Sequence, residues 1–167
     1  MSSADLCDQH GDELRIVPGH WQWFGARRQF SGPVLTLQAN GCNGEIRTAL
    51  AEPGAGRVLV IDAGSDPGAL LGDRLAALAL DNGWAGVLVH GNVRDRRALA
   101  ALDLGIVALG TWPQRSHNRA GGSPDVPLLL GATVVEPGDW LYADEDGVLV
   151  GRRNLSNSRP RLSLIHI

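Results

Sequence analysis

Two short polar motifs, separated by twenty residues, are the strongest candidates for chemistry in this sequence. Gly72-Asp73 precedes an apolar pattern of helical spacing, and Arg94-Asp95 follows an apolar run of strand length. Unpaired N–H groups at a helix N-terminus attract anions, and glycine lets a ligand approach the backbone closely. An arginine fork suits a carboxylate or an enolate, and a neighbouring aspartate can hold a hard cation such as Mg²⁺. The motifs therefore predict a site for an anionic ligand and a divalent cation.

The residues between the two motifs fit one helix, one turn and one strand. Apolar residues at 71, 75, 78 and 79 share a helix face within 70–82, and Asn82-Gly83 ends the helix. The run GVLVH at 86–90 predicts a buried strand. Because ligand sites in α/β proteins favour the C-terminal ends of such strands, we expect the chain to fold back and bring both motifs into one cleft. The alternative is that Arg94 only forms a structural ion pair with Asp73 or Asp95.

The remaining patterns predict one α/β domain over residues 1–151 with a β-α-β-α-β centre. Pro33 places the strand expected at 30–37 near a sheet edge or at a bulge. A long loop is expected over 111–125, followed by an antiparallel layer of short strands that covers the centre. The other expected strands are 57–62, 106–109, 126–131, 132–135, 140–143 and 148–151, and the other expected helices are 4–10, 45–51 and 95–102.

Composition excludes several classes of function. The sequence has a formal net charge of −3 with scattered arginines, which argues against direct nucleic-acid binding. No apolar run reaches the length of a membrane span, and the acidic start MSSADLCDQHGDE does not fit a signal peptide, so we expect a cytoplasmic protein. The sequence contains neither a G-x-G-x-x-G fingerprint nor a Walker A motif, so NAD and ATP are not expected. It also contains no lysine, which excludes a lysine Schiff base in any carbonyl chemistry.

The segment 152–167 is expected to be a tail, and its last residues LSLIHI are expected to have a distinct origin. They back-translate to CTGTCTCTTATACACATC, which matches a transposase end used in sequencing libraries. We therefore expect read-through of an adapter and leave residues after 156 out of the functional reasoning. An independent clone of the gene with the same ending would contradict this expectation.

Many short motifs in a fixed order resemble the RraA-like family, which includes regulators of ribonuclease E activity and 4-hydroxy-4-methyl-2-oxoglutarate (HMG) aldolases. The resemblance extends over nearly the whole chain to about Val150. The matching segments are ADLCD at 4–8, RQFSGPVLTL at 28–37, VLVIDAG at 58–64, GDRLAALALDNGWAGVLVHGNVRD at 72–95, LGIVALGTWPQRS at 104–116 and VPLLLGATVVEPGDWLYADEDGVLV at 126–150.

The resemblance implies a fold, an assembly and an activity. The fold is the β/β/α, swivelling-domain-like fold around a central βαβ unit, assembled as a homotrimeric ring with clefts between subunits. The aldolase members need Mg²⁺ or Mn²⁺, cleave HMG to two pyruvates and also decarboxylate oxaloacetate. Their substrate-binding segment corresponds to Gly72, Asp73, Arg74 and Leu75 together with Arg94, and their metal-binding aspartate to Asp95.

A metal-dependent lyase acting on a small 2-oxo acid is consistent with the chemistry of these residues. With no lysine available, a metal is the expected electron sink, Arg94 would neutralise the enolate oxygen and the backbone at 73–75 would hold the carboxylate. Asp73 is assigned the positioning of a water that acts as base or acid. A methyltransferase activity has no support, because the nucleotide-binding fingerprint is absent.

One departure from the aldolase pattern favours a second interpretation. After Arg-Asp and two further residues the aldolases carry an acidic residue, whereas this sequence has Ala98 there, with Arg96 and Arg97 adding positive charge. The alternative is therefore a non-catalytic protein that binds ribonuclease E and inhibits it.

Overall fold

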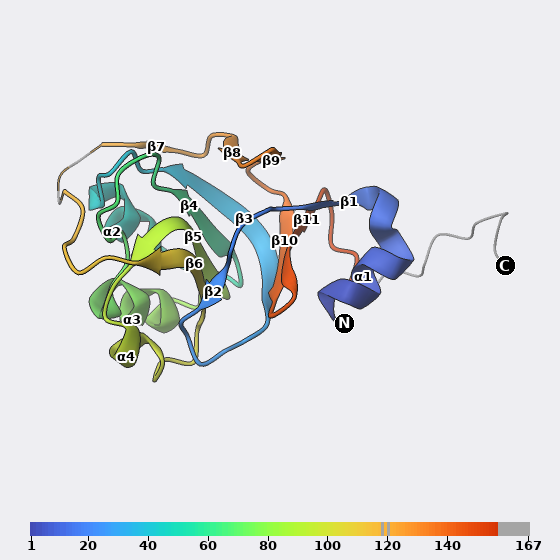
Figure 1. Cartoon of the computed structure of the whole chain (residues 1–167), viewed down its shortest axis with the longest axis horizontal. Helices are drawn as coiled ribbons and strands as arrows, with labels where there is room; N and C mark the ends of the chain where they lie inside the picture. Colours follow the sequence, from blue (N-terminus) through green and yellow to red (C-terminus); the bar gives the residue numbers. More distant parts are fainter. Residues whose placement is uncertain (118, 120, 157–167) are drawn as a thin grey trace, which may run out of the picture.

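Four parallel strands form the centre of the molecule, and a helix connects each strand to the next (Figure 1). The computed structural model describes residues 1–117, 119 and 121–156. The strands are apolar along most of their length because both faces of a parallel sheet are covered. This arrangement confirms the expected β-α-β-α-β centre. In chain order the elements are β3 (Phe30–Gln38), α2 (Gly44–Leu50), β4 (Val58–Asp62), α3 (Asp73–Asp81), β5 (Gly86–Val93), α4 (Arg96–Leu99) and β6 (Gly105–Thr111).

Antiparallel strands extend this sheet on both sides. The strand order is β1-β11-β10-β3-β4-β5-β6-β2, with β7 pairing to β3, and a separate hairpin joins β8 to β9. The expected antiparallel layer is therefore a separate sheet only at β8 and β9, because β3 continues from β10 and β11 into the parallel half. The strands added to the sheet are β1 (Leu14–Ile16), β2 (Gln22–Trp23), β7 (Ser123–Pro124), β10 (Trp140–Asp144) and β11 (Gly147–Gly151), and the separate hairpin consists of β8 (Leu128–Leu130) and β9 (Thr133–Val135).

The position of Pro33 differs from the expectation of an edge strand. β3 lies inside the sheet, but its first half pairs with β10 and its second half pairs with β4. Pro33 is opposite Trp140, and Val34 begins the pairing with β4. Proline is tolerated there because it stands where β3 changes partners, at the end of one ladder and before the start of the next.

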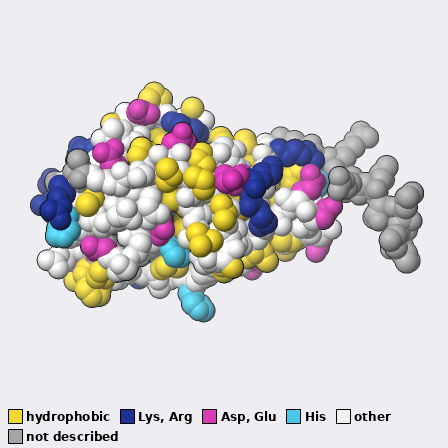
Figure 2. Space-filling model, turned by 90° about the horizontal axis from the view of Figure 1, so that it is seen from above, with side chains coloured by type: hydrophobic (Ala, Val, Ile, Leu, Met, Phe, Trp, Pro, Cys, Tyr) yellow, Lys and Arg dark blue, Asp and Glu magenta, His cyan; other side chains and the backbone are white. Residues whose placement is uncertain are grey.

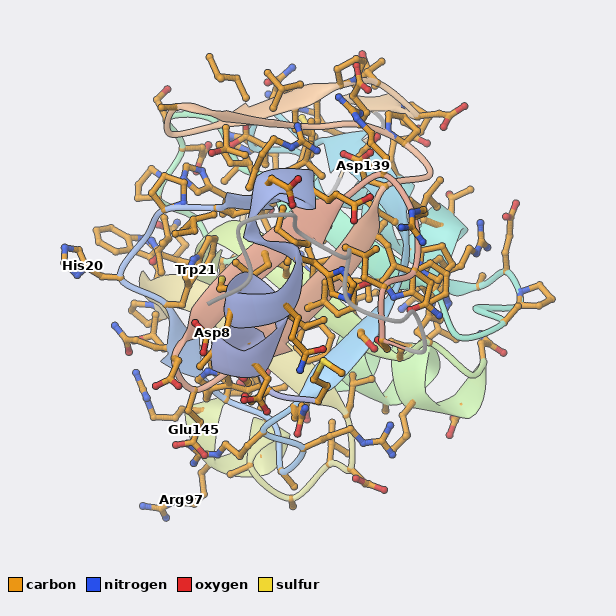
Figure 3. The ribbon with its side chains drawn as sticks, turned by 90° about the vertical axis from the view of Figure 1, so that its right-hand side faces the viewer. Asp8, His20, Trp21, Arg97, Asp139 and Glu145 are labelled. Atoms are coloured by element: carbon orange, nitrogen blue, oxygen red, sulfur yellow. The ribbon has the colours of Figure 1, made fainter. Side chains whose placement is uncertain are left out.

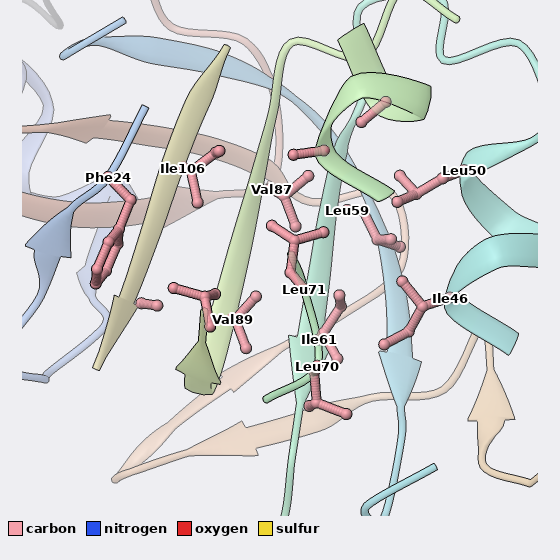
Figure 4. Packing of buried hydrophobic residues seen from close by; sticks show 14 of the residues in the cluster. Phe24, Ile46, Leu50, Leu59, Ile61, Leu70, Leu71, Val87, Val89 and Ile106 are labelled. Atoms are coloured by element: carbon pink, nitrogen blue, oxygen red, sulfur yellow. The ribbon is translucent and has the colours of Figure 1, made fainter. Parts of the chain in front are cut away.

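Two apolar clusters cover the two faces of the sheet. On one face, Ile46 and Leu50 of α2 pack against Leu59, Ile61 and the neighbouring strands (Figure 4). On the other face, side chains of β4, β5 and β6 meet those of β8 to β11. The C-terminal strands therefore do cover the centre as expected, although only β8 and β9 form a sheet of their own, whereas β10 and β11 belong to the same continuous sheet as the strands that they cover.

Helix α1 (Ser3–His10) and the short 3₁₀ helix Gly11–Glu13 lie at the end of the molecule away from α2 and α3 (Figure 1). The backbone N–H and the hydroxyl of Ser3 donate to the two carboxylate oxygens of Asp144, each at 2.7 Å. Burial raises the pKa of Asp144, but the hydrogen bonds from Ser3 and from the turn at 146–147 outweigh it and leave the pKa below its usual value. Asp144 thus anchors the start of α1 to β10.

Two of the three crossover helices, α3 and α4, are shorter than the sequence pattern indicates. Leu70 and Leu71 are extended, and α3 begins only at Asp73. α4 spans a single turn instead of the expected 95–102. Among the described residues, no helix has the length and apolarity that a membrane span requires. The residues assigned to adapter read-through lie outside the described part of the chain.

Candidate active site

The chain does fold back and bring the two polar motifs together. Leu71 forms an isolated parallel bridge with Val93, and the Arg94 N–H donates to the Leu71 carbonyl oxygen at 2.9 Å. Gly72-Asp73 follows directly after Leu71, and Arg94-Asp95 follows directly after Val93, so this bridge places the two motifs next to each other. The extended conformation of residues 70–71, which shortens the expected helix, is what makes the pairing possible.

Asp95 holds the N-terminus of α3 through its carboxylate. Its Oδ2 atom accepts the backbone N–H of Asp73 at 3.1 Å, whereas the N-cap residue Gly72 has no side chain to do so. Asp95 has a left-handed backbone with φ of 64° and ψ of 41°, a conformation that is uncommon outside glycine and concentrates at functional sites. Gly72 leaves room for this carboxylate, because a Cβ atom at position 72 would lie 2.6 Å from Asp95 Oδ2 and the carboxylate would have to shift.

This hydrogen bond changes which backbone N–H groups at the start of α3 can bind the expected anion. The Asp73 N–H is already engaged by Asp95, so it is not free to hold a substrate carboxylate. The next donors in the first turn of α3 are the N–H groups of Arg74 and Leu75, which have no acceptor in a preceding helical turn. The helix dipole adds to the attraction of these two groups for an anion.

Arg94 is not part of a structural ion pair within the described residues. Its Nη1 atom donates to the carbonyl oxygen of Pro113 at 3.3 Å, and neither Asp73 nor Asp95 lies within ion-pair distance of it. Arg94 as a whole residue is half-buried, and its guanidinium still has donors to offer to a ligand. The alternative of an Arg94–Asp73 or Arg94–Asp95 ion pair is therefore wrong for this structure.

All six residues assigned from the sequence line one open cleft of about 680 Å³. Two further arginines that sequence reasoning missed, Arg47 of α2 and Arg115 after β6, line the same cleft. Dark blue side chains also gather at the left end of the molecule in Figure 2, the end at which α2 and the loop after β6 lie in Figure 1. The assigned residues that the cleft brings together are Gly72, Asp73, Arg74, Leu75, Arg94 and Asp95.

Ala98 lies beside the same two aspartates on their other side. A second hollow of about 530 Å³ is lined by Asp73, Asp95, Arg96, Arg97 and Ala98. An acidic side chain at position 98 would therefore face the aspartates. The two added arginines do not crowd them: the Arg96 guanidinium lies 4.6 Å from the ring centroid of Phe24, and Arg97 points outward at the edge of the molecule (Figure 3).

The described residues fit a divalent cation that completes its coordination with water and substrate. Asp95 is exposed, and its Oδ1 atom has no hydrogen-bond partner in the described part of the chain. No group of three or more His, Cys, Asp or Glu side chains that could hold an ion occurs among the described residues. Mg²⁺ is commonly held by one or two carboxylates while it keeps several waters, and Mn²⁺ also prefers oxygen ligands. Asp95 suits that mode of binding, whereas a closed protein cage is not available.

Comparison with known proteins identifies the family of this fold and cleft. Residues 3–150 match the RraA-like family, described as Aldolase/RraA. A protein of Alkalilimnicola ehrlichii named "Putative 4-hydroxy-4-methyl-2-oxoglutarate aldolase" is 49% identical over 156 residues, which cover 93% of this chain and 97% of the relative.

Two solved structures are also similar over most of their length. The RNA-processing inhibitor RraA from Thermus thermophilis has a TM-score of 0.91 at 40% identity, covering 96% of this chain and 98% of that one. A Geobacillus kaustophilus protein titled as S-adenosylmethionine:2-dimethylmenaquinone methyltransferase has a TM-score of 0.90 at 44% identity, covering 93% and 97%. With the family match over residues 3–150, these likenesses show that the chain belongs to the RraA-like family.

Proposed function

We propose that this protein cleaves 4-hydroxy-4-methyl-2-oxoglutarate to two molecules of pyruvate and also decarboxylates oxaloacetate, with Mg²⁺ or Mn²⁺ as its cofactor. The observation that carries the proposal is the convergence of Arg94, Asp95 and the N-terminus of α3 in one cleft. Relatives named as aldolases, one of them 49% identical, support the same reaction class.

Both reactions break a carbon–carbon bond and leave the enolate of pyruvate, so the site must stabilise a developing oxyanion. Arg94 is assigned this role, because its guanidinium is anchored at Pro113 O and retains free donors. The N–H groups of Arg74 and Leu75 would hold the carboxylate next to the 2-oxo group. A bound cation supplies Lewis-acid polarisation of the 2-oxo group. Asp95 would hold that cation, and its hydrogen bond to Asp73 N–H fixes its position.

Asp73 is assigned the proton transfers. Its carboxylate is exposed at the mouth of both hollows, where a water molecule can reach it. In the retro-aldol reaction a base accepts the proton of the 4-hydroxyl group, and an acid then returns a proton to the enolate carbon. Decarboxylation needs only the second of these steps.

The test of this proposal is oxaloacetate decarboxylation by the purified protein, measured with EDTA and then with added Mg²⁺ or Mn²⁺. We expect no turnover with EDTA and turnover well above that of the free cation once either metal is restored. HMG cleavage, followed by coupling the released pyruvate to lactate dehydrogenase, should show the same metal dependence. A rate equal to that of free metal in both assays would contradict the proposal.

We also propose that the protein forms a homotrimer, as the family resemblance implies. Leu129 and Val134, which pair across the β8–β9 hairpin, are 63% and 40% exposed, and Ile16, whose carbonyl oxygen accepts the Thr133 hydroxyl, is 65% exposed. Such a group of neighbouring exposed apolar side chains is consistent with a subunit contact. Light scattering should give a mass about three times that of the 17.7 kDa chain. A monomeric mass would contradict the trimer.

The second candidate function is inhibition of ribonuclease E without catalysis. The replacement of an acidic residue by Ala98 favours it, and the Thermus thermophilis relative is titled an RNA-processing inhibitor. This candidate would be supported if the chain bound ribonuclease E equally well with and without EDTA and showed no metal-dependent turnover.

Restoring the acidic residue should strengthen metal binding. In Ala98→Glu the new carboxylate would face Asp73 and Asp95 across the second hollow. We expect the Mn²⁺ concentration for half-maximal decarboxylation to fall about tenfold, as is typical when a ligating group gains or loses a supporting carboxylate. Ala98→Gln is the matched control, because it has the same size without the charge. Equal metal requirements in the two variants would show that position 98 does not contribute to the cation site.

A further inference from the structure

The cleft carries more positive charge than the chemistry at Arg94 requires. Arg47, Arg74, Arg94 and Arg115 line it together with only two acids, Asp73 and Asp95, so its lining has a net charge of +2. The whole chain, by contrast, has a formal net charge of −3. Such a concentration of guanidinium groups in a concave site attracts anions, and most strongly those with two charges.

The additional arginines are not neutralised by neighbouring acids. Neither Arg47 nor Arg115 forms an ion pair or a side-chain hydrogen bond with any residue that the structure describes, and both are exposed. Arginines elsewhere do have acidic partners: Arg27 pairs with Asp103, and Arg15 pairs with the buried Asp139. The guanidinium groups of Arg47 and Arg115 are therefore available to a ligand.

The backbone places Arg115 and Arg94 at different positions along one extended segment. Ala69 forms a parallel bridge with Arg115, and two residues further on the Leu71 carbonyl accepts the N–H of Arg94. Two residues of extended chain span roughly 7 Å. The backbones of Arg115 and Arg94 thus contact this segment at two different points, and Arg47 reaches the same cleft from α2. Guanidinium groups that enter one cleft from three elements suit a short ligand with an anionic group at each end.

We propose that Arg47 and Arg115 bind the second carboxylate of the substrate and make the site selective for short 2-oxo dicarboxylates. This inference rests on the proposed function, in which Arg94 and the N-terminus of α3 hold the reacting end. Oxaloacetate and 4-hydroxy-4-methyl-2-oxoglutarate both carry a carboxylate at the far end, whereas pyruvate does not. Arg47 and Arg115 would then contribute to binding and specificity and take no part in bond cleavage.

The test compares Arg47→Met, Arg115→Met and the double variant with wild type in a phosphate-free buffer, because phosphate competes for guanidinium groups. For oxaloacetate we expect KM to rise about tenfold in each single variant and further in the double variant, while kcat changes little. Exchange of the pyruvate methyl protons with deuterium, followed by NMR, should keep its wild-type rate. Arg28→Met is the matched control, because Arg28 is exposed and lies outside the cleft.

A binding measurement separates failure of this inference from failure of the proposed function. Calorimetry with 2-oxoglutarate and with pyruvate needs no turnover. We expect the double variant to lose at least about tenfold in affinity for 2-oxoglutarate and to bind pyruvate as wild type does. If the wild type bound 2-oxoglutarate but showed no lyase activity, and the double variant lost that binding, the dicarboxylate site would be supported and only the proposed reaction would be contradicted. Unchanged affinity for 2-oxoglutarate, or an equal loss for pyruvate, would overturn the inference.

Discussion

Asp95→Asn is expected to lower metal-dependent oxaloacetate decarboxylation by about 100-fold while leaving the fold intact. Asparagine retains an acceptor for the Asp73 N–H, which Asp95 Oδ2 now accepts at 3.1 Å. It also tolerates the left-handed backbone that Asp95 adopts at φ of 64°. What asparagine removes is the negative charge that a hard divalent cation requires. The loss should therefore appear in the metal requirement and in turnover, with the melting temperature nearly unchanged.

Asp95→Ala gives the comparison that separates the two roles of this residue. Alanine removes the charge and also the helix cap, and it fits the left-handed backbone poorly. We expect the same loss of activity together with about 1–3 kcal/mol of lost stability, measured by urea denaturation. If the asparagine variant kept its activity while the alanine variant lost it, Asp95 would act through its position at the start of α3, and the assignment of the cation to Asp95 would be wrong. A loss of ribonuclease E binding in both variants would instead place Asp95 in a protein interface.

The sequence was sufficient to predict that the two polar motifs meet. Parallel strands joined by a helix must end at the same edge of a sheet, so 72–73 and 94–95 could be placed together from spacing alone. The role of Asp95 as a cap was not predictable in the same way. It depends on Gly72 lacking a side chain and on a left-handed residue at position 95. Aspartate adopts that conformation more often than most residues, but no pattern in the sequence marks this aspartate for it.

Arg47 and Arg115 were missed for a different reason. Arg47 lies on the short helix α2, and Arg115 lies in a segment read as a loop, so neither belongs to a motif with recognisable spacing. They reach the cleft because Ala69 pairs with Arg115 and because α2 packs near α3, contacts that join residues distant in sequence. A charge pattern along the chain carries no information about such pairings. The edge position predicted for the strand that contains Pro33 was wrong for a related reason. Only the tertiary fold shows that β3 pairs with β10 up to Pro33 and with β4 after it.

Gly72→Ala should reduce turnover by about 100-fold, while the free energy of unfolding falls by no more than the ~1 kcal/mol of a weakened helix cap. Gly72 has φ of −133° and ψ of −167°, an extended backbone that alanine adopts without strain. The added Cβ would, however, lie 2.6 Å from Asp95 Oδ2 and 3.5 Å from Arg94 Cγ. The carboxylate must move to relieve the first contact, and a displacement of about 1 Å in a catalytic group commonly costs about two orders of magnitude in rate.

Gly11→Ala is the matched control for this prediction. Gly11 also has an ordinary backbone, with φ of −56°, and a Cβ there meets no atom within 4 Å. Both variants add one methyl group, so a difference in their kinetics reports the surroundings of that group. We expect Gly72→Ala to need more metal and to turn over more slowly, and Gly11→Ala to behave as wild type. Full activity in Gly72→Ala would mean that the Asp95 carboxylate can shift without consequence. Catalysis would then not depend on the hydrogen bond by which the Asp73 N–H fixes that carboxylate.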